Sequence, residues 1–281
     1  MHEFSDHYTS VAIITLARSD LPDAMVKPRT SAAQATERTV ISVIGICGRA
    51  ANGESRPWLV EGADGHFYFL KRDNLSRDRL VTEYLVSRLA EECGLPVPPV
   101  QLLSLPAELI RHCAVDGARE LTPGIAFGSL RVSFAEEIRS AHLRSIEEET
   151  KLRCLCFDWW TENPDRALDR IGGDPNVLWD PVLQQIFLID HDRSLAPSFD
   201  SAAFLREHVF RDERPFLEKA FLSRWRTRFE SAVYHLAGIW DEMPGEWHTG
   251  PGKKKRLSFT RQEVEARLMK PKLPVEGLLV N

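Results

Sequence analysis

The stretch PWLVEGADGHFYFLK, residues 57–71, decides the fold of the first half of this chain. Residues 57–61 and 66–71 are rich in apolar and aromatic side chains, a composition typical of strands. Between them lies a four-residue segment with Asp64-Gly65 at its centre, and an Asp-Gly pair favours a tight turn. The stretch therefore predicts an antiparallel hairpin that ends on a lysine, Lys71.

The sequence on either side extends this hairpin into a larger β-rich unit. Residues 40–44 are β-branched and strand-like, and residues 100–105 are again apolar. Between the hairpin and the second of these segments, residues 76–93 have an apolar stripe at helical spacing, with Ser76 as an N-cap and Gly94 as a terminator. The first part is therefore expected to hold strands and one helix.

The second part has a different pattern. Residues 145–161 and about 202–241 have apolar and aromatic side chains at helical spacing, and a short helix is expected near 260–269. Residues 176–179 and 185–190 form a strand pair around an Asp-Pro turn. The order of elements predicts an α+β fold, with a β-rich part followed by a mainly helical part.

Composition and charge exclude several classes of protein. The chain has 281 residues, of which 43% are hydrophobic and 27% are charged, so it is an ordinary globular sequence rather than a disordered or fibrous one. Its net charge of −5 argues against nucleic acid as a general partner. Five irregularly spaced cysteines do not form a disulfide framework, and no apolar run is long enough for a membrane span. We expect a cytoplasmic protein.

The first candidate site pairs Lys71, at the end of its strand, with Glu83 on the following helix. Twelve residues separate the two, and the helix is expected to fold back over the sheet. A strand lysine paired with a helix glutamate is how protein kinases hold the α- and β-phosphates of ATP. Taken alone, Lys71 fits a solvated strand end, and Glu83 fits a surface carboxylate.

Two further candidate elements lie in the second part. Asp165 and Asn176 belong to a loop between a helix end and a strand, and phosphoryl transfer needs such a carboxylate for the acceptor and an amide oxygen for a metal. Asp190 ends an apolar strand, where a carboxylate suits Mg²⁺ bound to phosphate oxygens. Turn chemistry alone also explains each of these residues.

In combination, these segments resemble HipA-like kinases, and they are also similar to type II phosphatidylinositol 4-kinases. The resemblance covers about residues 39–247. The segments that carry it are Gly53-Glu54-Ser55-Arg56-Pro57, Asp64 through Lys71, Glu83 through Pro98, Gly124 through Ser129, Asn163-Pro164-Asp165-Arg166, Pro175 through Trp179, Ile189-Asp190-His191 and Pro244 through Trp247.

The resemblance implies a bilobal protein kinase-like fold, with a β-rich N-lobe containing one helix and a mainly helical C-lobe. It implies a kinase that uses ATP and Mg²⁺ and phosphorylates a Ser/Thr hydroxyl of a protein, with an antitoxin-like partner. The expected boundaries are an N-terminal extension, an N-lobe, a C-lobe and a C-terminal tail at residues 1–38, 39–120, 121–247 and 248–281.

The resemblance also implies roles for individual residues in binding the nucleotide. Gly53 and Ser55 belong to the loop over the phosphates, whose backbone N–H groups can bind anionic oxygens. Lys71 contacts the α- and β-phosphates, and Glu83 orients it.

By the same resemblance, Asp165 is the catalytic base, and Asn176 and Asp190 bind Mg²⁺. Arg166 stabilises the loop or a phosphate, and His191 and Asp192 are supporting residues. The eleven residues from Asp165 to Asn176 exceed the spacing of a kinase catalytic loop. For that reason Asp169 or Asp174 is an alternative to Asp165.

Several other functions stay open at this point. The acceptor could be a small molecule or a lipid head group, and the same residues with an inverted ATP would transfer AMP. A pseudokinase-like module would bind nucleotide without turnover. A metal nuclease would use Glu83, Asp165 and Asp190, but it needs neither the glycine-rich loop nor the Lys-Glu pair.

Overall fold

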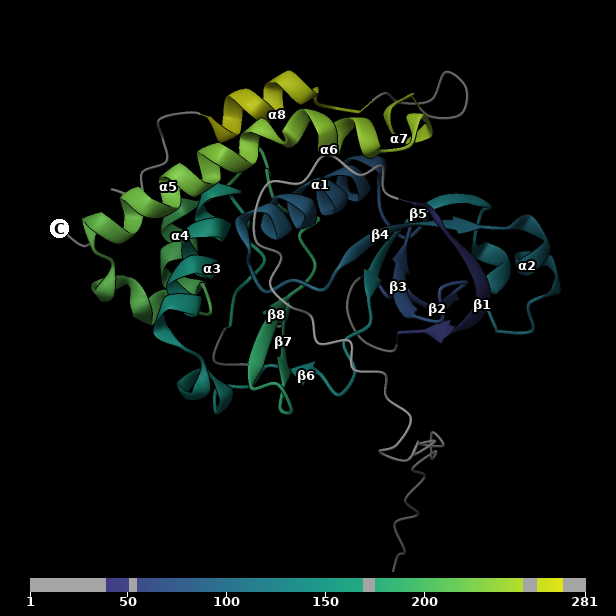
Figure 1. Cartoon of the computed structure of the whole chain (residues 1–281), viewed down its shortest axis with the longest axis horizontal. Coiled ribbons are helices and arrows are strands. Elements are labelled where there is room, and N and C mark those ends of the chain that lie inside the picture. Colours follow the sequence, from purple (N-terminus) through teal and green to yellow (C-terminus); the bar gives the residue numbers. More distant parts are fainter. Residues whose placement is uncertain (1–38, 51–54, 169–174, 250–256, 270–281) are drawn as a thin grey trace, which may run out of the picture. The chain divides into compact units, whose positions relative to one another are not determined.

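The computed structural model describes residues 39–50, 55–168, 175–249 and 257–269. Within these ranges the fold mixes strands and helices, as expected, with five of the strands joined in one barrel and most of the helices in the later part of the chain (Figure 1). The expected N-terminal extension, residues 1–38, lies outside the described residues.

The hairpin predicted at residues 57–71 forms the middle of a closed five-stranded barrel. The strand order is β1–β2–β3–β5–β4, and the barrel closes because β1 pairs with β4 in parallel. The strands are β1 (Ile41–Arg49), β2 (Trp58–Gly62), β3 (Phe67–Lys71), β4 (Val100–Leu105) and β5 (Gly124–Leu130).

Two features of the barrel differ from the expectations. β1 ends at Arg49, five residues beyond residue 44, its expected end. Bulges between Val43 and Gly45 and between Ile46 and Gly48 absorb the glycines without ending the pairing. β5 was not predicted as a strand, and it lies beyond residue 120, the expected end of the first part. Position 128 requires glycine, which has no Cβ, because a Cβ there would lie 2.5 Å from Leu103 Cδ1 on β4.

The predicted helix is α1 (Arg77–Cys93), and its ends are as expected. The Ser76 side chain accepts a hydrogen bond from the Arg79 N–H, and Gly94 has a left-handed φ of 69°. Leu85 and Leu89 on its inner face are completely buried, and burial of each such side chain stabilises the fold by about 1.5–3 kcal/mol. α1 is therefore fixed firmly beside the barrel, where it also contacts β4 and β5.

The barrel part contains more helix than the single one expected. α2 (Ala107–His112) and the 3-10 turn η1 (Ala118–Glu120) follow β4 and pack near β1. With six and three residues, these elements are too short for a helical period to be detected in the sequence.

The later part of the chain consists of a small sheet and a group of helices. The sheet has the order β6–β7–β8, and β7 and β8 are the predicted hairpin. The strands are β6 (Glu136–Glu137), β7 (Val177–Asp180) and β8 (Gln185–Leu188), and the helical segments are η2 (His142–Ser145), α3 (Glu148–Trp160), α4 (Ser201–Glu207), η3 (Arg211–Phe216), α5 (Lys219–Tyr234), α6 (Leu236–Glu242), α7 (Gly245–Thr249) and α8 (Arg261–Leu268).

Aromatic side chains hold these helices together. Trp160 of α3 stacks on Phe229 of α5 with ring centroids 4.6 Å apart, and Phe157 packs edge-on against both. The helical pattern at residues 202–241 is divided into several elements, in part because Pro215 interrupts it at η3.

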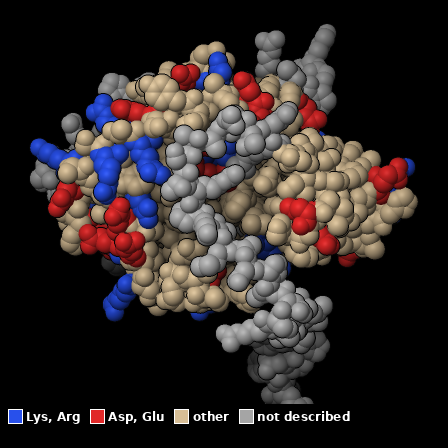
Figure 2. All heavy atoms as spheres, in the orientation of Figure 1, with Lys and Arg blue, Asp and Glu red and all other residues tan. Residues whose placement is uncertain are grey.

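The surface charges are unevenly distributed. On the face shown in Figure 2, Lys and Arg side chains gather over the helical part, whereas the barrel part is largely uncharged with a few acidic groups. None of the helices in the described ranges is long and apolar enough to cross a membrane. All five cysteines are free thiols.

Candidate active site

Lys71 is the last residue of β3, which lies between β2 and β5 in the barrel. Its side chain is almost completely buried, and its Nζ lies 3.2 Å from Glu83 Oε1 and 2.8 Å from Asp190 Oδ1. Although burial opposes the charge, the carboxylates of Glu83 and Asp190 raise the pKa of Lys71 above its usual value. Lys71 is therefore an ammonium ion held between two carboxylates from different elements.

α1 contributes more than Glu83 to this site. Arg79, Glu83 and Ser87 are four residues apart and form one stripe along the helix. Arg79 Nη2 lies 2.9 Å from Asp192 Oδ1, Glu83 Oε2 accepts a 2.7 Å hydrogen bond from the His191 N–H, and Ser87 Oγ lies 3.2 Å from His191 Nδ1. One face of α1 is thus bonded to the segment that follows β8.

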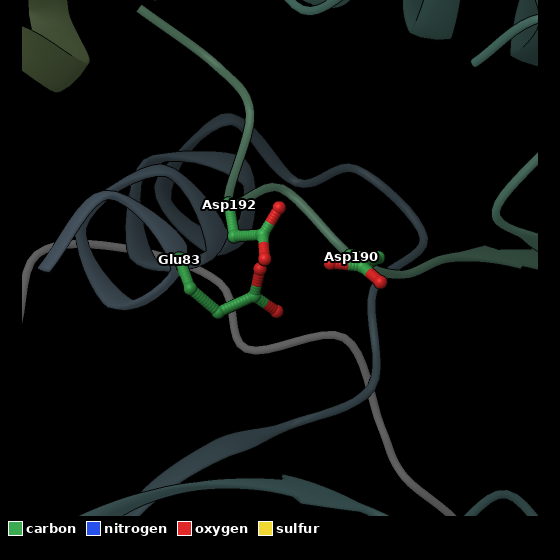
Figure 3. A group of neighbouring side chains, drawn as sticks. All are labelled: Glu83, Asp190 and Asp192. Atoms are coloured by element: carbon green, nitrogen blue, oxygen red, sulfur yellow. The ribbon is translucent and has the colours of Figure 1, made fainter. Parts of the chain in front are cut away.

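Three carboxylates meet at this contact, as Figure 3 shows. Glu83 comes from α1, Asp190 and Asp192 come from the segment after β8, and one oxygen of each lies within 4.8 Å of the others. Burial raises the pKa of Glu83 and of Asp192, whereas Lys71 outweighs the effect of burial and lowers the pKa of Asp190. Asp190 is therefore the carboxylate most readily kept ionised for a cation.

Asn176 and Asp190 lie at the same end of the β7–β8 hairpin. Asn176 precedes β7, Asp190 follows β8 by two residues, and the Ile189 N–H donates a 3.0 Å hydrogen bond to the Asn176 carbonyl. Both have a left-handed φ, 53° for Asn176 and 55° for Asp190. A left-handed φ is uncommon for residues other than glycine, and among these it is adopted most readily by Asn and Asp. The backbone at both ends of the hairpin therefore favours the residue types found there.

Asp165 lies beside Asn176. The Asn176 side-chain amide donates a 3.1 Å hydrogen bond to Asp165 Oδ2, and the Asp165 N–H donates one of 3.1 Å to Asn163 Oδ1. Burial raises the pKa of Asp165, although Arg193, 3.6 Å away, opposes the shift. Asp165 and Asn176 therefore lie in contact with each other. The alternatives to Asp165, Asp169 and Asp174, lie outside the described residues.

Arg166 connects the loop to the hairpin from inside the protein. Its Nε donates a 2.7 Å hydrogen bond to Asp158 on α3, and its Nη1 donates to the backbone carbonyls of both Asn176 and Ile189. His208 Nε2 lies 3.0 Å from the same Asp158 oxygen. Although burial acts in the opposite direction, Arg166 and His208 lower the pKa of Asp158 to about 2.

A pocket opens in front of these polar groups. It has a volume of about 380 Å³, and at one end it is lined by Lys71, Asn176 and Asp190. The rest is mostly apolar and comes from the barrel, the α1–β4 link and the hairpin: Phe69, Val97, Val100, Phe127, Leu178 and Leu188. An apolar pocket with a few convergent charges suits a ligand with a flat base and an anionic end.

The remaining sequence-predicted residues are placed as follows. Ser55 lines the pocket and is buried, with its carbonyl accepting from the Asn74 side chain. Gly53 lies outside the described residues, so its predicted role is not addressed by the structure.

Several residues of the site were not predicted. Arg79 and Ser87 could have been found from their four-residue spacing to Glu83. Asp158 and His208 had no local signal, because they are 50 residues apart and meet only in the folded protein.

A family model described as HipA-like kinase matches residues 43–274. Among solved structures, the chain is similar to the crystal structure of the Helicobacter pylori proinflammatory kinase CtkA, with 12% identity and a TM-score of 0.46 over 83% of this chain and 99% of that one. The search of curated proteins gave no match.

Proposed function

This chain belongs to the HipA-like kinase family, and from that premise we propose that it transfers the γ-phosphoryl group of ATP to a Ser/Thr hydroxyl of a protein. Family membership implies a kinase that uses ATP and a divalent metal. The observation that carries the proposal is the position of Lys71, bonded to Glu83 and Asp190 at the polar end of an apolar pocket.

We propose that the barrel with α1 acts as the N-lobe and the helical part with β6–β8 as the C-lobe of a bilobal kinase. Because β5 pairs with β3 and β4, the boundary belongs after β5, near residue 131, rather than at residue 120. The pocket is lined by both parts, which is where a nucleotide would bind in such an arrangement.

The distribution of polar and apolar groups in the pocket supports one orientation of the nucleotide. The base would occupy the apolar section, and the phosphates would extend toward Lys71, whose ammonium contacts the α- and β-phosphates while Glu83 holds it in place. Gly53 and Ser55 would cover the phosphates from the loop after β1.

Mg²⁺ is the expected metal, and Asn176 and Asp190 are the residues that would hold it. An amide oxygen and an ionised carboxylate, which here lie at the same end of the β7–β8 hairpin, are the hard oxygen ligands that Mg²⁺ prefers. When bound, the ion would neutralise charge on the transferred phosphoryl group.

Asp165 would act on the acceptor. The hydroxyl oxygen forms a bond to the γ-phosphorus, the bond from that phosphorus to the β,γ-bridging oxygen breaks, and ADP leaves with the electron pair. The hydroxyl proton passes to the Asp165 carboxylate, whose pKa is raised by burial and which Asn176 orients.

A protein acceptor and an antitoxin-like partner are further parts of the proposal, taken from the family resemblance. A cytoplasmic location, expected from the composition of the sequence, is another. A nuclease is disfavoured because Lys71 is paired with two of the three carboxylates that it would use, Glu83 and Asp190. Transfer of AMP and phosphorylation of a lipid or small molecule are separate outcomes of the experiment below.

The test incubates the protein with Mg²⁺ and ATP labelled at either the γ- or the α-phosphate, in the presence of a protein extract. We expect γ-label on a protein band, with the label on phosphoserine or phosphothreonine after hydrolysis. Asp165→Asn should abolish it, whereas Asp212→Asn, whose side chain is 90% exposed, should not. Transfer of α-label, or γ-label only in lipid or small molecules, would contradict the proposed acceptor chemistry.

A further inference from the structure

α1 carries a second polar stripe beside the one that contacts the candidate active site. The side chains of Tyr84 and Arg88 both contact Glu242 of α6. The Tyr84 hydroxyl donates a 2.7 Å hydrogen bond to Oε2, and Arg88 Nε lies 3.2 Å from the same oxygen. Each follows a residue of the first stripe, Glu83 or Ser87, so the two stripes are about 100° apart around the helix axis.

The contact with Glu242 is shielded from solvent. Tyr84 is completely buried, Arg88 is 6% exposed, and the Glu242 side chain is 22% exposed. Arg88 Nη2 adds a second contact of 3.3 Å to the other oxygen of the carboxylate. Charge-assisted hydrogen bonds in such surroundings are stronger and less screened by salt than surface pairs.

We propose that Glu242 is a positioning residue for phosphoryl transfer, which fixes the rotation of α1 and thereby holds Glu83 against Lys71. The inference rests on the proposed kinase function. α1 is one rigid helix of 17 residues, so a rotation that moves Tyr84 away from Glu242 also moves Glu83 away from Lys71. With contacts on two faces, the helix has one favoured rotation rather than a range.

A neighbouring contact connects α1 to the barrel as well. Trp247 of α7 packs edge-on against Tyr84 with ring centroids 5.8 Å apart, and its indole N–H donates a 3.2 Å hydrogen bond to the Ile125 carbonyl in β5. β5 pairs with β3, the strand of Lys71. The α6–α7 segment, which lies along α1 in Figure 1, therefore contacts α1, the helix of Glu83, and β5, the strand beside that of Lys71.

The test compares Glu242→Gln and Tyr84→Phe with Glu230→Gln. Glu230 forms an ion pair of 2.9 Å with Arg226 of the same helix, α5, and both side chains are exposed. We expect kcat to fall about tenfold in the first two variants with little change in KM for ATP, because the Lys-Glu pair acts on the transferred phosphates. The control should match the wild type.

A second measurement separates positioning from general stability. In a Glu83→Gln background, Glu242→Gln should cause no further loss of kcat, because Glu242 acts through Glu83. Amide hydrogen exchange in α1 should rise in Glu242→Gln without nucleotide, while exchange in α4 stays unchanged.

Equal losses in the wild-type and Glu83→Gln backgrounds, or unchanged exchange in α1, would overturn the inference. If the wild type transfers no phosphoryl group, the proposed function fails, and the exchange of α1 still decides whether Glu242 fixes the helix.

Discussion

Asp158 and Arg166 form an ion pair from which water is completely excluded, with both side chains 0% exposed and 2.7 Å between Oδ2 and Nε. The pair supports both ends of the β7–β8 hairpin, because Arg166 also donates to the carbonyls of Asn176 and Ile189. Removing one partner of such a pair leaves the other charge buried without compensation.

Asp158→Asn should therefore lower the free energy of unfolding by about 3–5 kcal/mol. Urea unfolding measures this loss. The control is Glu149→Gln, which removes the exposed pair with Arg224 and should cost less than about 1 kcal/mol. Equal effects of the two substitutions would contradict the assigned role of Asp158.

His208 should make the stability depend on pH. Burial lowers its pKa below the ordinary 6.5, although Asp158 opposes the shift. The unfolded chain therefore binds a proton near pH 6.5 while the folded protein does not. The contribution of neutral His208 to the free energy of unfolding is fully present above pH 6.5. It is lost as the pH falls, by up to about 1.4 kcal/mol for each pH unit.

Unfolding at pH 7.5 and pH 5.5 checks this dependence. His208→Gln should lose less stability between the two pH values than the wild type does. His112→Gln, at a side chain that is 79% exposed, should keep the wild-type dependence. A His208 variant with the same pH slope as the wild type would show that His208 does not contribute to it.

Gly128 allows β5 to approach Leu103 of β4. A Cβ at this position would lie 2.5 Å from Leu103 Cδ1, so Gly128→Ala should destabilise the protein by about 1–3 kcal/mol. At Gly238 in α6 a Cβ meets nothing within 4 Å, and Gly238→Ala should instead stabilise by about 0.5–1 kcal/mol. Thermal unfolding distinguishes the two signs, and Leu103→Ala should partly rescue Gly128→Ala.

Asn176 combines a left-handed backbone with the proposed metal-binding amide, and Asn176→Gly separates the two. Glycine keeps the φ of 53° without strain but removes the amide, so activity should fall and need more Mg²⁺ while stability is kept. Gln184→Gly, at a φ of 54° in the β7–β8 turn, should leave the Mg²⁺ dependence unchanged. A Mg²⁺ titration of kinase activity measures the difference, and an unaltered titration for Asn176→Gly would exclude a metal-binding role.

The parts of the fold that depend on neighbouring residues could be predicted from the sequence. The β2–β3 hairpin and the caps of α1 have local signals, and Lys71 and Glu83 are only twelve residues apart. The site between the two parts of the protein depends on distant contacts instead. Glu242 is 158 residues from Tyr84 and looks like an ordinary surface glutamate in the sequence.

Four of the five barrel strands could be predicted from the sequence, but the closed barrel could not, because it also depends on distant contacts. Its closure needs the parallel pairing of β1 with β4 and the insertion of β5 between β3 and β4, which no pattern of apolar residues specifies. Glycines also hid the end of β1 and the whole of β5 from prediction. In a sequence, a glycine that allows a bulge or a close approach between strands cannot be distinguished from one that ends a strand.

Closing the barrel also determines how a protein substrate could be recognised. Each of its five strands already has two neighbours, so an extended peptide cannot add to it as a further strand. In the other described sheet, the outer strands β6 and β8 have two and four residues, and both residues of β6 are exposed glutamates. Both edges are short and one is charged, which discourages strand addition. A peptide acceptor would therefore be selected by its side chains and not by its backbone, and its sequence preference should be readable from a library of short peptides.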